Sequence, residues 1–230
     1  MLKRIWVLWT ICLLVVGLTA CGKSKCQETP TTKHIPDDKN VAVNAGKIKV
    51  YADEAKYYLF TAQATYETYY LTQDESIDWG KKMTGNTTWE TVVKGQVLDE
   101  ICQRECFYAL AGQYNVSLTD LEQVTLNKMV KAYFSETDEE LKKKIGIDEK
   151  RLKTIFEKDM VARKVEDVLE AMSADDGSDQ KKGDEIYRQW KENNLVMATE
   201  TWEEIRLEGH IFTKEDLTNN QVLLDETGTK

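Results

Sequence analysis

The sequence predicts an all-α fold, and three observations support this fold class. Both prolines of the 230-residue chain, Pro30 and Pro36, lie near its N-terminus, so the long remainder lacks this helix breaker. Apolar residues recur at the three- and four-residue spacing of helices, whereas the alternation that is typical of strands is scarce. Threonines are repeatedly followed by glutamate three residues later, as in a helix capping box. We expect one helical domain over residues 44–207.

The first two helices of this domain enclose an aromatic loop. A helix is expected over residues 52–70, because apolar and tyrosine side chains recur there in a 4-3-4-3 spacing. Residues 71–86 form the loop, and Thr87 with Glu90 predicts the capping box of a second helix that runs to about Gln113. The side chains that give the first helix its spacing are Ala55, Leu59, Ala62, Tyr66 and Tyr69.

The next two helices are indicated by their caps. Thr119 with Glu122 predicts the start of a third helix, which ends near residue 134. Thr137 with Glu140 opens a short fourth helix, and Gly146 can close it.

The C-terminal part of the chain begins with a long fifth helix over residues 148–172. Residues 173–183 are rich in Asp, Ser, Gly and Lys and predict a hinge. A short helix around Trp190, an extended segment over 195–199 and a polar tail over 208–230 complete the expected order. The side chains of the fifth helix that are expected to face inward are Leu152, Ile155, Ala162, Val165, Leu169 and Met172.

Residues 1–20 have the segment order of a bacterial export signal. Lys3 and Arg4 precede an uncharged run of 16 apolar or small residues, 5–20. A membrane-spanning helix needs roughly 20 apolar residues, so this run favours a signal peptide over a permanent anchor.

The end of this run matches the lipobox of bacterial lipoproteins. Leu18, Thr19 and Ala20 would be recognised by the signal peptidase, and Cys21 would become the lipidated N-terminus. A plain signal peptide, or a signal anchor with an incidental cysteine, is the alternative. Residues 21–43 are polar and predict a flexible tether. The expected location is therefore the cell membrane, with the domain lipid-anchored on the extracytoplasmic side.

The charge of the chain excludes one class of partner. The formal net charge is −9, and Lys3 and Arg4 supply two positive charges, so residues 21–230 carry −11. An acidic surface repels the phosphate backbone, so we expect no nucleic-acid partner.

Cysteines and histidines indicate no metal or cofactor site. Cys102 and Cys106 stand four residues apart on one helical face, where a disulfide would be poorly oriented. The only histidines, His34 and His210, lie far from them in the sequence, so we expect buried thiols that act as small hydrophobic side chains. Pairing of Cys26 with a partner is left open.

No catalytic motif is found in the sequence. It contains no glycine-rich phosphate loop, no Gly-x-Ser-x-Gly elbow and no His-Glu-x-x-His. His34 falls in the expected tether, so His210 alone would have to serve any imidazole chemistry. The sequence therefore favours a binding protein over an enzyme.

A series of short motifs carries a family resemblance. These are Val43-Asn44-Ala45-Gly46-Lys47-Ile48, Asp53-Glu54-Ala55, Asp78-Trp79, Ala109-Leu110-Ala111 and Val116-Ser117-Leu118-Thr119. Their order, after a lipoprotein signal and tether, resembles that of the N-terminal helical domain of the extracytoplasmic PrsA/SurA-type foldases. The resemblance covers about residues 43–172. It implies a SurA N-terminal-like helical fold that cradles unfolded client chains.

The chain departs from this family where its catalytic domain would stand. In the family a parvulin domain isomerises prolyl bonds, but only about a dozen polar residues separate the fifth helix from Ile186 here. A folded domain takes at least about 50 residues. Residues 206–212 resemble the first parvulin strand, and only 18 residues follow Phe212. We therefore expect no parvulin domain.

Aromatic side chains near the first helix are the candidate client-binding residues. Neighbouring tyrosines diverge by about 100° around a helix, so some of them must approach the surface, where they suit adaptable binding. The candidates are Tyr57, Tyr58, Tyr69, Tyr70 and Trp79. The expected partners are the membrane, through the lipid, and unfolded or partly folded exported polypeptides. The alternatives are a degenerate peptidyl-prolyl isomerase that uses His210 and an adaptor lipoprotein that holds one specific partner.

Overall fold

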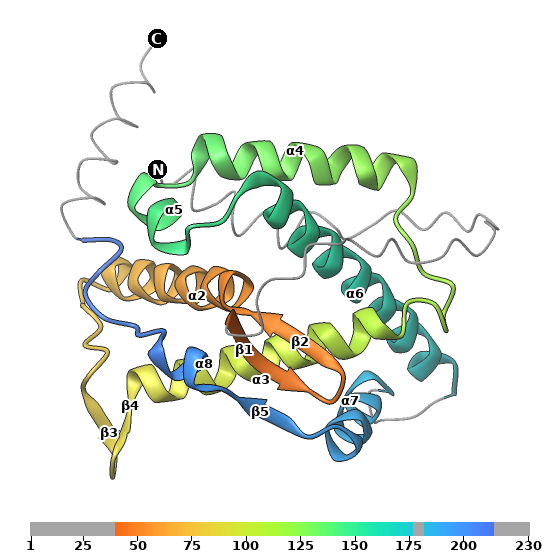
Figure 1. Cartoon of the computed structure of the whole chain (residues 1–230), viewed down its shortest axis with the longest axis horizontal. Helices are drawn as coiled ribbons and strands as arrows, with labels where there is room; N and C mark the ends of the chain where they lie inside the picture. The colour runs from red at the N-terminus through yellow and green to blue at the C-terminus, as the bar shows by residue number, and fades with distance from the viewer. Residues whose placement is uncertain (1–39, 177–181, 214–230) are drawn as a thin grey trace.

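A computed structural model describes residues 40–176 and 182–213 as a mostly helical fold with a small antiparallel sheet (Figure 1). The expected export signal, nearly all of the tether, the middle of the expected hinge and the end of the C-terminal tail lie outside the described residues. The helical expectation is confirmed in its coarse form. The expectation of an all-α fold misses the sheet.

The sheet joins the start of the domain to its C-terminal part. Strands β1 (Val41–Ala45), β2 (Ile48–Tyr51) and β5 (Val196–Ala198) have the order β2-β1-β5, and both pairings are antiparallel. The β1–β2 turn contains Gly46 at φ +62°, where an added Cβ would collide with the side chain of Asn194. Strand β1 starts at Val41, three residues before residue 44.

Helix α2 (Ala52–Thr72) follows β2 directly, and a short hairpin separates it from α3 (Trp89–Ala109). The hairpin strands β3 (Lys82–Thr84) and β4 (Thr87–Thr88) project from the body in Figure 1. Thr88 caps α3, because its hydroxyl accepts a hydrogen bond from the Thr91 N–H at 3.2 Å. The predicted cap at Thr87 is therefore wrong by one residue.

Helices α4 (Asp120–Glu136) and α5 (Glu139–Ile145) follow. The predicted capping box of α4 is confirmed, because the Thr119 hydroxyl accepts from the Glu122 N–H and the Glu122 carboxylate accepts from the Thr119 N–H. Helix α5 is capped by Asp138 instead of the predicted Thr137, and Gly146 ends it at φ +67° as expected.

Helix α6 (Glu149–Asp176) is the central element of the helical layer. Helices α3, α4 and α7 (Lys182–Asn193) pack against it, and α2 packs mainly against α3 and α5 while its side chains also reach α6. In Figure 1, α4 runs along the top of the molecule, α3 runs along the bottom, and α8 (Glu200–Glu204) lies beside the sheet. Met172 is 37% exposed, so it does not face inward as predicted. The predicted inward residues that are buried are Leu152, Ile155, Ala162, Val165 and Leu169.

Candidate functional site

A cleft of about 280 Å³ lies between α2, α3, α4 and α6, and we call it the α2 cleft. One wall comes from a single face of α2, because its residues recur at the three- and four-residue spacing that places side chains above one another on a helix. The opposite wall comes from Arg104 of α3, Met129 of α4, and Phe156 and Met160 of α6. The α2 residues of the cleft are Tyr57, Tyr58, Thr61, Ala62, Thr65 and Tyr66.

Rings and thioethers make much of the cleft surface. The Tyr57 ring packs edge-on against the rings of Tyr58 and Phe156, with centroid distances of 5.2 and 5.8 Å. Met129 is half-buried and Met160 is buried beside them. Tyrosine and methionine offer large, adaptable apolar surfaces, so this wall suits a ligand with apolar groups.

The polar side of the cleft is centred on Asp159. The Tyr58 hydroxyl donates to Asp159 Oδ1 at 2.7 Å, and Arg104 Nη1 lies 3.5 Å from the same oxygen. The guanidinium of Arg104 also lies over the Tyr58 ring, 5.3 Å from its centroid. Burial raises the pKa of Tyr58 well above its ordinary value, and the nearby Asp159 carboxylate adds to this, so the hydroxyl stays a donor.

An ion-pair cluster beneath the cleft ties α2 to α3 and α6. Lys158 Nζ lies 2.7 Å from the buried Glu54 carboxylate and also contacts the buried Glu105 carboxylate. Arg151 donates to Glu54 at 3.0 Å and to Asp53 at 2.7 Å. Burial raises the pKa of Glu105, with Lys158 opposing the shift and Glu54 adding to it. The cluster therefore links three of the four helices that line the cleft.

Hydrogen-bonding capacity remains unused inside the cleft. Among the described residues, Thr61 Oγ1 and Arg104 Nε are buried atoms without a hydrogen-bond partner, and both residues line the cleft. Tyr133 Oη is likewise buried without a hydrogen-bond partner, and the Tyr133 ring lies next to the rings of Tyr57 and Phe156. Buried polar groups are normally paired, so such atoms call for an explanation.

A second buried carboxylate holds the C-terminal segment. Glu67 of α2 accepts from the backbone N–H groups of Ile211 at 2.7 Å and Phe212 at 3.0 Å, and from Trp79 Nε1 at 3.0 Å. Ile211 and Phe212 are buried, so the expected polar tail starts too early when it is placed at residue 208. The sequence pattern misses this because two apolar residues in a polar context do not reveal a buried partner.

Two of the five predicted client-binding residues line the α2 cleft, and the other three do not. Tyr57 and Tyr58 are mostly buried and form a wall of the α2 cleft. Trp79 was expected in an exposed loop but is 4% exposed and bonded to Glu67, so it is not available at the surface. Tyr69 is 61% exposed and Tyr70 is half-buried, and both lie away from the cleft.

The structure describes some of the other predicted residues and leaves others outside its described ranges. The lipobox residues Leu18, Thr19, Ala20 and Cys21, like Cys26, lie outside the described residues. Cys102 and Cys106 are free and buried, as predicted, and burial raises the pKa of each thiol to about 12. His210 is exposed on the surface, with Nδ1 3.6 Å from Glu67 Oε1.

Comparisons with known proteins give no match. No protein-family model fits the chain, and neither a curated protein nor a solved structure is significantly similar to it. Within residues 40–176 and 182–213, no helix has the length and apolar character to cross a membrane. The same residues contain no group of three or more His, Cys, Asp or Glu side chains placed to hold a metal ion.

Proposed function

We propose that this chain is a lipid-anchored extracytoplasmic lipoprotein whose helical domain binds segments of unfolded or partly folded exported polypeptides. The lipobox pattern that ends at Cys21 supports the anchor, and the order of motifs from Val43 onward supports kinship with the helical domain of the PrsA/SurA-type foldases. In this proposal the chain binds clients without a catalytic parvulin domain, and the membrane places it where exported chains emerge.

One observation carries the proposal, namely the composition of the α2 cleft. Its rings and methionines present apolar area, and removing such area from water contributes roughly 25 cal/mol per Å². Its volume is close to the lower end of about 300–1,000 Å³ for small-ligand pockets, which fits a few residues of a longer chain. Ordering a flexible client opposes binding, so each affinity should be modest.

A prolyl isomerase is the alternative function, and the cavity beside His210 is the feature that favours it. His210 and Glu67 line a second cavity of about 270 Å³, together with Phe212 and Ser76. A degenerate prolyl isomerase would use this imidazole. Against it, a parvulin insert between α6 and α7 has no room, because only five residues separate Asp176 from Lys182. Turnover of a Xaa-Pro peptide that is lost in His210→Ala would favour this alternative.

Aggregation suppression tests the proposal. The full chain in lipid nanodiscs should reduce aggregation of a chemically unfolded model polypeptide, whereas empty nanodiscs should not. Ala62→Phe fills the cleft from α2 and should abolish most of the suppression. Ala171→Phe adds the same ring at an exposed position of α6 and is the matched control.

Melting curves of both variants separate a blocked cleft from a damaged fold. Suppression by Ala62→Phe that equals the wild type, at an unchanged melting temperature, would contradict a role for the cleft. Absence of suppression by the wild type would leave the adaptor alternative, in which the domain holds one specific folded partner.

A further inference from the structure

Among the described residues that line the α2 cleft, Thr61 Oγ1 and Arg104 Nε are buried atoms without a hydrogen-bond partner. Thr65 lies one helical turn after Thr61, and its hydroxyl donates to the Thr61 carbonyl oxygen at 2.9 Å. The Thr61 hydroxyl makes no such bond within the described part of the chain, although it is buried. Thr61 therefore does not form the kind of hydrogen bond, to the carbonyl oxygen one turn earlier, that satisfies the Thr65 hydroxyl. A hydroxyl left in this state is destabilising unless a ligand or a solvent molecule accepts its hydrogen bond.

Arg104 presents a donor in the same cleft. Its Nη1 lies 3.5 Å from Asp159 and its Nη2 lies 3.9 Å from Glu100, while Nε has no partner among the described residues. The guanidinium is held in place by these two carboxylates and by the Tyr58 ring beneath it. An arginine that is fixed on one side and unbonded at Nε can donate to an incoming oxygen without reorganising.

The charges around Arg104 indicate which kind of oxygen fits. Glu100 and Asp159 lie 3.9 and 3.5 Å from the guanidinium, so a further carboxylate there would meet two like charges nearby. With Arg163, the charged side chains of the cleft lining are two cations and two anions, so the lining as a whole calls for no further charge. A main-chain carbonyl oxygen is a strong acceptor with no net charge, and each residue of a polypeptide supplies one. Uncharged carbonyl oxygens therefore suit these donors better than an anion does.

The length of the cleft agrees with a polypeptide segment. The α2 wall extends from Tyr57 to Tyr66, which is about 14 Å at 1.5 Å per helical residue. An extended chain rises about 3.3 Å per residue, so roughly four residues span this wall. Their side chains would lie against the rings and methionines while the carbonyl oxygens face the donors.

We propose that the α2 cleft binds an extended, uncharged polypeptide segment through its main-chain carbonyl oxygens, with Thr61 Oγ1 and Arg104 Nε as the donors. This inference rests on the proposed client-binding function and names the chemistry by which a client is recognised. It makes recognition tolerant of sequence, since every residue carries the accepting carbonyl, and it disfavours segments with acidic side chains at the donors.

The experiment measures binding of a fluorescent hexapeptide of Ala, Val and Ser, acetylated and amidated at its ends, to the full chain in nanodiscs by anisotropy. Thr61→Val should raise Kd about fivefold, the size expected for one hydrogen bond. The variant should melt at or above the wild-type temperature, because it removes an unpartnered hydroxyl. A merely structural role of the Thr61 hydroxyl would instead lower the melting temperature.

Two further variants complete the test. Arg104→Lys keeps the charge but loses Nε, and it should raise Kd at least as much as Thr61→Val. Thr68→Val, about two turns after Thr61 on α2 and outside the cleft lining, removes a hydroxyl that is already bonded to the Ala64 carbonyl, and Kd should stay within about twofold of the wild-type value, as for an uninvolved group. A hexapeptide with glutamate at its third position should bind more weakly than the uncharged one.

The outcomes distinguish this inference from the function on which it rests. Unchanged Kd values for both Thr61→Val and Arg104→Lys, with clear wild-type binding, would overturn the carbonyl inference and leave client binding intact. Tighter binding of the glutamate peptide would also overturn it. No binding of either peptide by the wild type would overturn both.

Discussion

Lys158 contacts two buried carboxylates at once, and this sharing sets the protonation of the cluster under the α2 cleft. Glu54 has a second cation, since Arg151 donates to it at 3.0 Å, whereas Glu105 has an ion pair with Lys158. The free-energy cost of moving two charged groups out of water can exceed the Coulomb attraction that the buried pair gains. The raised pKa of Glu105 follows from its burial and from the neighbouring Glu54 carboxylate.

The pH dependence of stability should therefore contain a contribution from Glu105. Because its pKa is raised in the folded state, the folded chain binds more protons than the unfolded chain between the ordinary and the raised pKa. The free energy of unfolding must then fall as pH rises through this window. Glu105→Gln cannot titrate, so relative to wild type it should be more stable at pH 8 than at pH 5.

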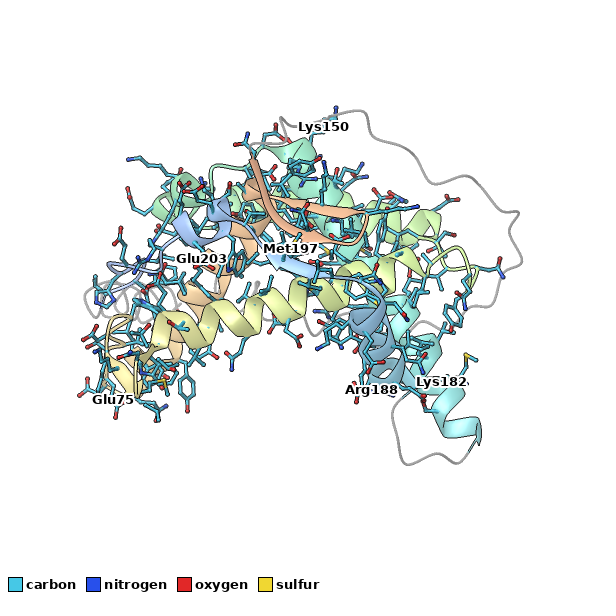
Figure 2. All side chains as sticks on the ribbon, turned by 60° about the horizontal axis from the view of Figure 1, so that its bottom comes forward. Glu75, Lys150, Lys182, Arg188, Met197 and Glu203 are labelled. Carbon is cyan, nitrogen blue, oxygen red and sulfur yellow. The ribbon has the colours of Figure 1, made fainter. Side chains whose placement is uncertain are left out.

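Urea unfolding at the two pH values measures this difference. Glu75→Gln at an exposed position is the control, and Figure 2 shows Glu75 at one end of the molecule, far from α6. The control should change wild-type stability equally at both pH values. A Glu105→Gln variant whose relative stability is the same at pH 5 and pH 8 would show that Glu105 is ionised throughout.

At the scale of elements, the helix N-termini show how accurately a local sequence pattern predicts where a helix starts. Thr119 and Glu122 bond reciprocally, so their pattern locates the start of α4 to the residue. Thr87 and Glu90 have the same spacing, but the cap is Thr88, whose hydroxyl accepts from the Thr91 N–H. A capping pattern thus predicts that a helix starts, but it can miss the first residue by one.

The sheet could not be predicted in the same way. Strand β1 has five residues, and its partner β5 lies about 150 residues further along the chain. Such short segments carry little periodicity, and nothing local marks two distant segments as partners. The extended segment expected over 195–199 did coincide with β5, although its pairing was not foreseen.

The capping box of α4 gives a prediction at this scale. Thr119→Ala removes the acceptor for the Glu122 N–H and should lower the free energy of unfolding by about 1 kcal/mol. Thr125→Ala in the exposed interior of α4 should leave it equal or slightly higher, because alanine favours helix. Chemical denaturation of both variants measures this. Equal losses in the two variants would contradict the role of the cap.

At the scale of the whole molecule, charged side chains are spread over the surface that Figure 2 shows. In Figure 2, Lys150 lies at the top, Glu203 and Met197 of β5 lie in the middle, and Arg188 and Lys182 lie together on α7 at the lower right. The apolar wall of the α2 cleft stands apart from this charged exterior because it lies between helices. A polypeptide in the cleft would leave that exterior uncovered.

The anchoring prediction concerns the chain as an exported molecule. If the lipobox is used, Cys21→Ser should abolish incorporation of labelled fatty acid and leave an unprocessed precursor or a secreted form, because the thiol carries the lipid. Cys26→Ser is the matched control and should be lipidated normally. Labelled Cys21→Ser protein would refute the assignment.

The candidate site could be predicted only in part. The tyrosine-rich face of α2 pointed to Tyr57 and Tyr58, which do line the cleft, although their rings are mostly buried. Thr61 and Arg104 were missed, because the pattern of one helix does not tell which helix will face it. Trp79 was misplaced because the sequence does not reveal that its indole bonds to a buried Glu67.

Site-specific photocrosslinking tests the central claim, binding of unfolded polypeptide in the α2 cleft, most directly. The full chain in nanodiscs would carry benzoylphenylalanine either at Tyr66, in the cleft, or at Leu121, which is 61% exposed on α4. With a labelled unfolded polypeptide present, we predict strong crosslinking from position 66 and little from position 121, with loss of the crosslink when Ala62→Phe is added. Equal crosslinking from both positions, or none from position 66, would contradict the account.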